Sequence, residues 1–347
     1  MRAVSGGDLK SRVSDLGFAA LVLFGLALPN ASASAPTVQS SAPKTQSQFF
    51  HGIEYMRLDR WAESQRLEFR WVVPRQEASL SSSWSTLSFN NDSRRCQLNG
   101  VTAWLSYPIA SQNGMLWISL PDVKSTLHPV LFPVRNPAGR KVQTICLDAG
   151  HGGKDPGNRE GRQQEKTHTL LLTTELSKQL TAAGFNVILT RSGDAFVDLL
   201  LRPEIARRRR ADLFVSLHFN SAGSGDGRTV QGTEVYCLTP PRASSTNARG
   251  EGAGTGAFPG NQNDSGNMLL AHQVQRSLVR RLGVEDRGVK RARFAVLRTA
   301  EMPAILIEGG FMTHPAEAKR IYDPAYRRKM AGAIVEGIIG YRKIVEQ

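Results

Sequence analysis

The feature that most constrains the fold is an alternation of short apolar runs with helical segments across residues 136–347. The runs are rich in β-branched residues and bounded by turn residues, as buried strands are; they cover residues 144–147, 187–189, 213–217, 235–238 and 304–307. The segments between them have the apolar spacing of helices and cover residues 165–183, 199–210, 269–282 and 326–341. Strands that alternate with helices predict an α/β fold with a mostly parallel sheet flanked by helices. We assign this domain to residues 141–347.

Residues 49–134 have a different pattern, in which apolar and polar residues alternate over short stretches. Asn99-Gly100 and Asn113-Gly114 separate these stretches, and Asn-Gly is typical of tight hairpin turns. We therefore predict a smaller, mainly-β N-terminal domain. Its segment QLNGVTAWLSYPIASQNGMLWISLPDV resembles the repeat of copper-amine-oxidase-like N-terminal domains, which are common beside exported cell-wall enzymes. The resemblance includes no catalytic residue, so we expect this domain to position or tether the next one, and it is a candidate for wall targeting.

Residues 1–33 have the organisation of a secretory signal peptide. Three basic residues precede a run of 13 apolar residues at positions 16–28, and a small-x-small cleavage pattern ends at Ala33. A membrane-spanning helix needs about 20 apolar residues, so the run predicts export and no stable membrane anchor. The Ser-, Pro- and Gln-rich residues 34–48 predict a flexible linker. The mature protein is thus expected in the periplasm or cell envelope of a bacterium.

The charge of the chain points to an anionic partner. The sequence has 44 Lys and Arg against 30 Asp and Glu, a net charge of +14, and removal of residues 1–33 leaves +13. A basic surface favours nucleic acid, anionic lipid or an acidic wall polymer, and export argues against nucleic acid. The three cysteines include no C-x-x-C pair, which excludes a disulfide-stapled mini-protein, a zinc finger and a thioredoxin-like site.

Two histidines and two glutamates occur where predicted strands end and where the first helix begins. The first strand leads into GHGGKDPG, which contains His151, and Glu165 opens the helix that follows. The third strand ends in residues 216–220, which include His218, and the last ends in residues 306–311, which include Glu308. Ligands of α/β sheets bind beyond the carboxyl ends of the strands, so we expect these side chains to converge.

This set of residue types matches one kind of metal site. Two histidines and a carboxylate with an open fourth position are the ligands of a catalytic Zn²⁺, and a further carboxylate can take the proton of its bound water. Each residue also has a structural alternative. A histidine after a strand can be held by hydrogen bonds, and a glutamate at a helix start complements the helix dipole.

Ordered sequence blocks add a resemblance to the zinc-dependent N-acetylmuramoyl-L-alanine amidases. The blocks are CLDAGHGGKDPG, EKTHTLLLTTEL, GFNVILTR, ADLFVSLHFNSA, GTEVYCL, LGVEDRGVKRARFAVLR and PAILIEGGFMTHPAEAKRI, and they cover nearly all of residues 141–343. The resemblance implies that peptidoglycan is the partner and that the enzyme hydrolyses the amide between N-acetylmuramic acid and the L-alanine of the peptide stem. It also implies that His151, Glu165 and His218 hold Zn²⁺. Glu308 matches the residue that acts as general base in that family.

Three further polar residues are secondary candidates. Asn220 is expected to hydrogen-bond substrate or to orient a neighbour. Asp148 and Asp155 are expected either to hold the ligands in place or to cap their loops. Residues 239–266 form a polar insertion of 28 residues without helical or strand periodicity. Its glycines disfavour a stable helix that would block the site, so we expect disorder or a rim of the substrate groove.

Two other functions stay open at this stage. A catalytically silent cell-wall binding protein would keep the fold and the basic surface but lose the metal, and the presence of all four residues argues against it. An exported zinc peptidase that cuts within the stem peptide shares the reaction type, but the sequence has no H-E-x-x-H helix. The sequence identifies no activator protein.

Overall fold

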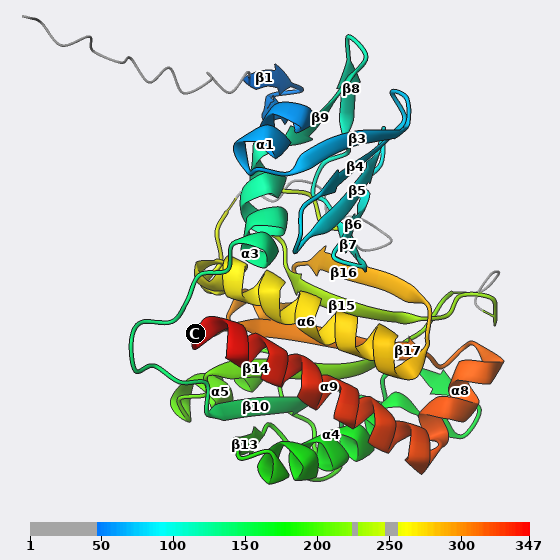
Figure 1. The fold of residues 1–347 in the computed structure, drawn as a ribbon. Coiled ribbons are helices and arrows are strands. Elements are labelled where there is room, and N and C mark those ends of the chain that lie inside the picture. Colours follow the sequence, from blue (N-terminus) through cyan, green and yellow to red (C-terminus); the bar gives the residue numbers. More distant parts are fainter. Residues whose placement is uncertain (1–46, 224–227, 247–255) are drawn as a thin grey trace, which may run out of the picture. The chain divides into compact units, whose positions relative to one another are not determined.

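The computed structural model describes residues 47–223, 228–246 and 256–347 (Figure 1). The predicted signal peptide, nearly all of the predicted linker and the middle of the 239–266 insertion lie outside these residues. Ser47 and Gln48 already belong to the first strand, so the linker prediction ran two residues too far. Within the described ranges, no helix is long and apolar enough to cross a membrane.

A mixed sheet, eleven-stranded in the described part of the chain, carries the site. Its C-terminal strands are β10 Thr144–Ala149, β13 Asn186–Leu189, β14 Leu213–Asn220, β15 Thr233–Leu238, β16 Asp286–Ala292 and β17 Ala304–Phe311, in the spatial order β13-β10-β14-β17-β15-β16. Strands β13, β10, β14 and β17 are parallel to one another, whereas β15 runs antiparallel to β17 and parallel to β16. The predicted α/β fold with a mostly parallel, helix-flanked sheet is confirmed.

Helices cover both faces of this sheet. They are α4 Glu165–Ala182, α5 Leu201–Arg208, α6 Asp264–Leu282, α7 Ala295–Arg298, α8 Pro315–Tyr322 and α9 Pro324–Val345, and a short hairpin, β11 Arg159–Glu160 and β12 Gln163–Gln164, precedes α4. Helices α4, α6 and α9 pack apolar residues against one face, and Figure 1 shows α6 and α9 side by side across it. Helices α5 and α7 cover the other face, where Ala206 and Leu297 pack on strand residues.

The alternation of side chains along β14 and β17 decides which face carries their polar residues. Ile305 and Ile307 pack under α4, α6 and α9, whereas Leu306 packs on the face of α5 and α7. Because successive strand residues point to opposite faces, Glu308 continues the row of Leu306. The same alternation puts His218 on the face of α5 and α7, since it lies four residues after Phe214, which packs there.

The N-terminal β region, residues 47–134, is mainly β as predicted from its pattern. Its elements are β1 Ser47–Phe50, β2 Ile53–Arg57, α1 Leu58–Ser64, β3 Glu68–Val73, β4 Glu77–Ser81, β5 Thr86–Asn90, β6 Arg95–Leu98, β7 Val101–Trp104, β8 Ala110–Gln112, β9 Met115–Ser119, α2 Leu120–Asp122, a π-helical turn Val123–Leu127, and α3 His128–Leu131. Strands β1, β2, β8 and β9 form a separate four-stranded sheet. Both residues of each Asn-Gly pair have positive φ, for example 52° at Asn99 and 78° at Gly100, as the predicted hairpin turns require.

Strands β3 to β7 of this region extend the sheet that contains β10 to β17, because β7 pairs with β16 in parallel through Ala103 and Val289. Two side chains strengthen the junction. The Oδ2 atom of Asp286 accepts the Thr102 N–H at 2.6 Å, and Nε2 of the buried His272 lies 2.8 Å from the Leu98 carbonyl oxygen.

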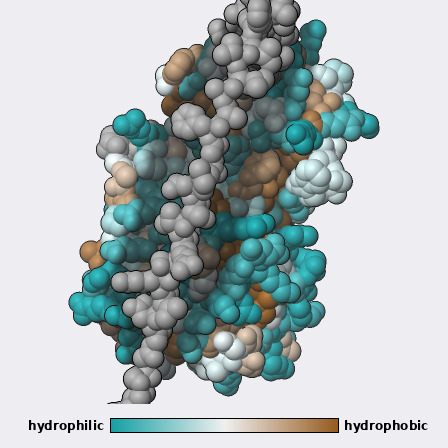
Figure 2. All heavy atoms as spheres, turned by 60° about the vertical axis from the view of Figure 1, so that its left-hand side comes forward, coloured by the Kyte–Doolittle hydropathy of each residue, from teal (hydrophilic) through white to brown (hydrophobic). Residues whose placement is uncertain are grey.

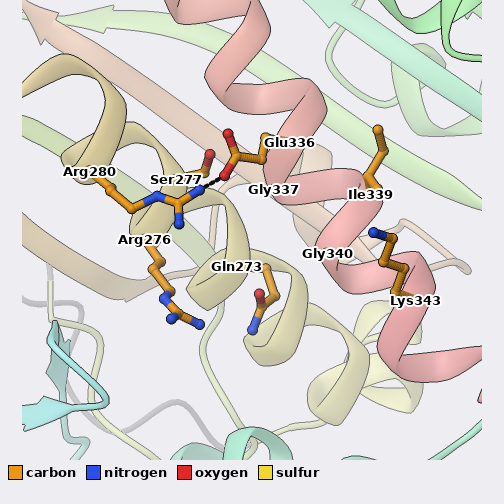
Figure 3. A pocket seen from close by; sticks show the side chains of 9 residues that line it. All are labelled: Gln273, Arg276, Ser277, Arg280, Glu336, Gly337, Ile339, Gly340 and Lys343. Carbon is orange, nitrogen blue, oxygen red and sulfur yellow. Dashed lines mark ion pairs between the residues drawn. The ribbon is translucent and has the colours of Figure 1, made fainter.

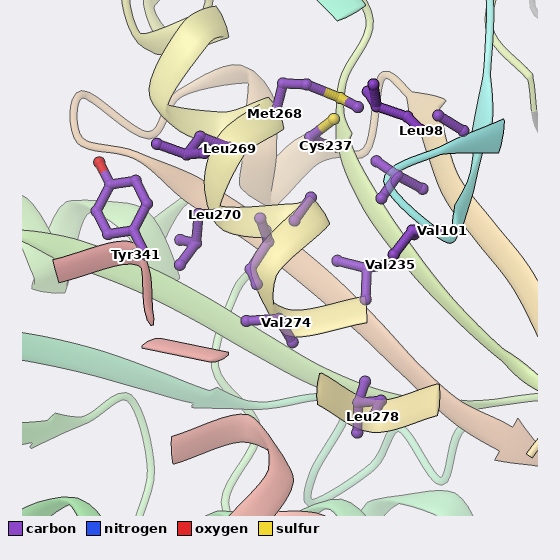
Figure 4. Close-up of a cluster of buried hydrophobic side chains, with 14 of the residues drawn as sticks. Leu98, Val101, Val235, Cys237, Met268, Leu269, Leu270, Val274, Leu278 and Tyr341 are labelled. Carbon is purple, nitrogen blue, oxygen red and sulfur yellow. The ribbon is translucent and has the colours of Figure 1, made fainter. Parts of the chain in front are cut away.

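The two regions also share a hydrophobic core. Figure 4 shows Leu98 and Val101 of the N-terminal β region beside Met268 of α6 and Cys237 of β15, and all four belong to one buried cluster. The two predicted domains are therefore joined by a sheet and by a core, and not by a tether alone.

Candidate metal centre

The predicted site residues lie at the carboxyl ends of β10, β14 and β17, which are adjacent in the sheet. His151 follows β10, whereas His218 and Glu308 lie inside β14 and β17 and oppose each other in register. β14 ends at Asn220 and β17 ends at Phe311, within the segments predicted to close these strands. Backbone pairing continues past the last apolar residue, since a ladder needs only N–H and C=O groups, whereas the apolar pattern stops at the first polar side chain.

Three of the four predicted residues form a compact group. His151 Nε2 lies 3.1 Å from Glu165 Oε2, and His218 Nδ1 lies 3.0 Å from Glu165 Oε1. One ligand atom from each residue lies within 4.8 Å of the others, and no further group of this kind occurs in the described parts of the chain. Glu165 is the first residue of α4, as predicted, so its carboxylate is carried to the sheet edge by the start of that helix.

Backbone geometry lets the loop after β10 approach these rings. A Cβ atom at Gly150 would lie 2.3 Å from a ring atom of His218, and one at Gly157 would lie 2.6 Å from atoms of both His151 and Glu165. His151 itself has a φ of 61°, in the left-handed region that side chains rarely adopt. Such backbone persists only where the surroundings hold it, and it clusters at functional sites.

The charges of the group favour an ionised carboxylate between two histidines. Burial acts to raise the pKa of Glu165, but hydrogen bonds from His151 and His218 outweigh it and hold this pKa well below its ordinary value. Burial likewise opposes the charged form of His151, but Glu165 and Asp155 raise its pKa overall. A buried anion held between two ring nitrogens is an arrangement suited to a cation.

Asp155 is the predicted secondary residue that contacts a member of the group. Its Oδ2 atom lies 2.8 Å from His151 Nδ1, and its Oδ1 atom accepts the Gly157 N–H at 3.0 Å. A carboxylate on one ring nitrogen of a histidine orients the other nitrogen toward a metal. Here Nε2 is the nitrogen that faces Glu165.

Glu308 stands beside this group and has an unusual carboxylate. Its Oε2 atom is buried and accepts no hydrogen bond from any described residue. Burial raises the pKa of Glu308 well above its ordinary value, and the nearby carboxylates of Glu165 and Glu234 raise it further, while Lys290 opposes the shift. This carboxylate therefore has a high affinity for a proton.

Asp148 lies beneath the site and contacts none of the three grouped residues directly. Its oxygens accept hydrogen bonds from Thr190, Ser216 and Arg202. Arg202 also donates to the carbonyl oxygen of His151 at 2.9 Å, so Asp148 supports the His151 loop through this arginine.

Replacing Asp148 with Asn is expected to destabilise the protein. The Arg202–Asp148 pair is 2.8 Å long with both side chains at most 2% exposed, so the variant leaves a buried guanidinium without its counter-charge. Loss of one partner of a buried pair costs about 3–5 kcal/mol, which urea unfolding measures. Glu204→Gln, at an exposed pair on α5, is the matched control and should change stability little. Equal midpoints for the two variants would contradict the role given to Asp148.

Asn220 does not join the group. It is the last residue of β14, and its Oδ1 atom accepts the N–H of Ser221 at 2.8 Å. Its role toward substrate stays a prediction.

Several polar residues near the site were not predicted from the sequence. Arg191 and Arg202 donate to carbonyl groups of the loop after β10, Glu234 lies on β15 next to β17, and Lys290 lies on β16 beyond it. A charged residue within an apolar strand was the sequence feature that could have identified Glu234. Lys290 lies in β16, a strand too rich in charge to be predicted.

Two cavities differ in their relation to this group. One of about 660 Å³ is lined by Asp155 and Arg202, which both contact His151, and by Lys154, Phe196, Leu200 and Arg298. Another, of about 250 Å³, lies between α6 and α9 (Figure 3) and includes no predicted site residue. Only the first cavity adjoins the candidate site.

A helix-flanked sheet that gathers two histidines and a glutamate beside a further carboxylate is an arrangement expected of metal-dependent hydrolases. Comparison with known proteins gives the family. The chain belongs to the N-acetylmuramoyl-L-alanine amidase family (Amidase_3), whose model matches residues 145–340. The amidase class predicted from the sequence blocks is confirmed.

Two relatives by sequence agree with this assignment. The chain is 36% identical over 243 residues to the amidase AmiC of Neisseria meningitidis, a match that covers 64% of this chain and 58% of AmiC. It is 33% identical over 230 residues to the amidase AmiA of Escherichia coli, covering 58% and 76%. Among solved structures, the amidase AmiC2 of Nostoc punctiforme is 32% identical and covers 59% of this chain and 99% of its own, with a TM-score of 0.49. The family match begins after the N-terminal β region, whose resemblance to copper-amine-oxidase-like domains stays a prediction.

Proposed function

We propose that this protein is an exported, zinc-dependent amidase that hydrolyses the amide between N-acetylmuramic acid and L-alanine in peptidoglycan. The observation that carries the proposal is the group of His151, Glu165 and His218, with its ligand atoms within 4.8 Å, on the same sheet edge as Glu308. The family and the names of the relatives support the substrate class.

The donor set fits Zn²⁺. Two imidazole nitrogens and one carboxylate oxygen are a known set of three protein ligands for catalytic zinc, which leaves a fourth position for water or substrate. Asp155 on the far nitrogen of His151 is the outer partner that such ligands usually have. When bound, Zn²⁺ would lower the pKa of a water molecule and polarise the substrate carbonyl.

The residues of the chain would handle the proton. Glu308 accepts a proton from the attacking water, whose oxygen bonds to the lactyl carbonyl carbon. Glu308 then delivers this proton to the amide nitrogen as the carbon–nitrogen bond breaks, so that L-alanine leaves with a free amine. The Oε2 atom of Glu308 is suited to this role because no donor among the described residues competes for it.

The cavity of about 660 Å³ beside His151 is the proposed place for the rest of the substrate. Phe196 and Leu200 are about half exposed there, and the Lys154 ammonium lies 4.4 Å from the Phe196 ring centroid. Apolar surface with cationic groups suits a sugar–peptide polymer that carries carboxylates.

Export and wall binding are part of the same proposal. The signal peptide predicted for residues 1–33 and the net charge support them. Figure 2 shows one face of the described residues on which hydrophilic side chains predominate. Peptidoglycan is anionic, so the basic chain would be attracted to it. No activator protein is proposed.

Digestion of soluble muropeptides tests the function against its two rivals. We expect mass spectrometry to find intact peptide stems and free glycan, with zinc in the purified protein. Fragments cut within the stem would support the zinc peptidase instead. Absence of both zinc and cleavage would support the silent wall-binding protein.

We further propose that the N-terminal β region, residues 47–134, stabilises residues 141–347 in addition to any role in wall targeting. Deleting it is expected to lower the melting temperature of the remaining chain, because the deletion unpairs β16 and removes Leu98 and Val101 from the shared core. Differential scanning calorimetry of the truncated protein measures this. A truncated protein that melts at the temperature of the full chain would show that the region is only attached.

A further inference from the structure

A second buried carboxylate lies next to Glu308 and has no part in the mechanism described above. Glu234 of β15 is only 1% exposed. Its oxygens are fully engaged: Oε1 accepts Lys290 Nζ at 3.0 Å and Arg287 Nε at 2.5 Å, and Oε2 accepts the Tyr236 hydroxyl at 2.6 Å. Burial acts to raise the pKa of Glu234, but Lys290 and these hydrogen bonds hold it below its ordinary value.

The register of the sheet sets Glu234 directly opposite Glu308. The two residues are partners in the antiparallel ladder of β15 and β17, so their side chains share one face with Cβ atoms about 4.5–5.5 Å apart. Glu308 in turn is the partner of His218 in β14. One row across three strands thus holds His218, Glu308 and Glu234.

The two carboxylates are in very different surroundings. Glu234 has three donors, whereas Oε2 of Glu308 has none among the described residues. Two like charges this close favour a shared proton unless cations compensate one of them. Lys290, which is 7% exposed, supplies a buried cation that acts on both carboxylates.

The N-terminal β region reaches this cluster through Trp104 of β7. The Trp104 ring centroid lies 5.5 Å from Lys290 Nζ, within the range of a cation–π contact. Its Nε1 atom donates to the carbonyl oxygen of Arg287 at 2.9 Å. Strand β16, which carries Arg287 and Lys290, is therefore held by β7 on the side away from β15.

We infer that Lys290 and Glu234 are positioning residues for Glu308, with Glu234 fixed by Lys290 so that Glu308 is the carboxylate left free to take the proton. This inference rests on the proposed role of Glu308 as general base. Lys290 and Glu234 touch neither the reacting atoms nor the proposed metal ligands. Their effect on turnover therefore passes through Glu308.

A double-mutant cycle tests this inference. Lys290→Met is made in the wild-type protein and in Glu308→Gln, with kcat and KM measured on a soluble muropeptide and with zinc content measured on each protein. In the wild-type background we expect kcat to fall by roughly 10²-fold, as misplacement of a reacting group can, with KM and zinc unchanged. In the Glu308→Gln background the same change should alter kcat by less than about 2-fold, the usual limit of additivity error. Lys343→Met, at an exposed position on α9, is the matched control.

Thermal unfolding of the metal-free proteins gives a readout that is independent of turnover. Lys290→Met should lower the melting temperature, because Glu234 loses a buried counter-charge. Glu234→Gln combined with Lys290→Met should recover part of the loss. If Lys290→Met does not fold, Lys290→Gln, which keeps a hydrogen-bond donor without the charge, replaces it in the cycle.

Two results would overturn the inference. The first is a Lys290→Met protein whose kcat equals that of the wild type. The second is an equal fall in kcat when Lys290→Met is made in the wild-type protein and in Glu308→Gln, because the cluster would then act on the fold and not on Glu308. Near-normal turnover of Glu308→Gln alone is a separate outcome, which would overturn the general-base assignment itself.

Discussion

Replacing His218 with Ala is expected to remove zinc and activity together while the fold survives. His218 and His151 are the two proposed nitrogen ligands on either side of Glu165, so the variant would leave only two of the three proposed protein ligands. Loss of a hydrogen-bond partner of a ligand already costs 10–100-fold in metal affinity or activity, and loss of a ligand should cost more. Both hydrophobic clusters of the described residues exclude His218, so the core keeps its packing.

Zinc analysis, turnover and circular dichroism on this one variant measure the effect. His51→Ala is the matched control, because His51 is an exposed turn residue of the N-terminal β region. A folded His218→Ala protein that keeps full zinc occupancy would show that the ligand assignment is wrong.

Glu308→Gln is expected to keep zinc and to lower turnover by roughly 10²–10⁴-fold, the contribution of a positioned acid–base group. The amide keeps the shape of the side chain but cannot accept the proton of the attacking water. The neutral amide also replaces a buried carboxylate that lies beside Glu234 and Glu165, so the fold should not lose stability.

Zinc content, melting temperature and turnover together separate the alternatives for Glu308. Reduced zinc would make it a fourth ligand, and a lower melting temperature with normal turnover per folded molecule would make it a structural anchor. Normal zinc with near-normal turnover would end the general-base assignment. Glu301→Gln, at an exposed position before β17, is the control substitution.

The sequence predicted the strands that carry the site. The apolar runs of β10, β14 and β17 are visible because a strand buried on both faces needs apolar residues at successive positions. The apolar pattern stops at His218 and Glu308, but the backbone ladder continues through the segments predicted to close β14 and β17. The predicted site residues were found by type and position, and the fold brings three of the four together.

Elements without an apolar pattern were missed. Strand β16 has the sequence DRGVKRA. Its Arg287 and Lys290 are paired with Glu234, and its Arg291 donates to the carbonyl oxygens of Leu238 and Ser125, which no local pattern indicates. The insertion predicted to lack periodicity over residues 239–266 contains a 3₁₀ helix, Pro259–Asn263, and the first turn of α6. Gly260 packs there against the Leu297 carbonyl, a contact between distant segments that sequence spacing does not reveal.

The support beneath the site was also out of reach of the sequence. Asp148 on β10 was predicted as a secondary site residue. Its partner Arg202 lies on α5 and was not predicted. The sharing of one sheet by residues 49–134 and 141–347 depends on a single pairing between β7 and β16. Such contacts depend on tertiary packing and have no local signature.

Hydrolysis in water enriched in ¹⁸O shows which carbonyl carbon the water attacks. We expect one ¹⁸O atom to enter the lactyl carboxylate of the released N-acetylmuramic acid, because water attacks that carbonyl carbon. The peptide stem should leave unlabelled, with a free L-alanine amine. Mass spectrometry of the two products reads both outcomes in one experiment. Label in a carboxylate of the peptide, with the lactyl group still bound to L-alanine, would contradict the account.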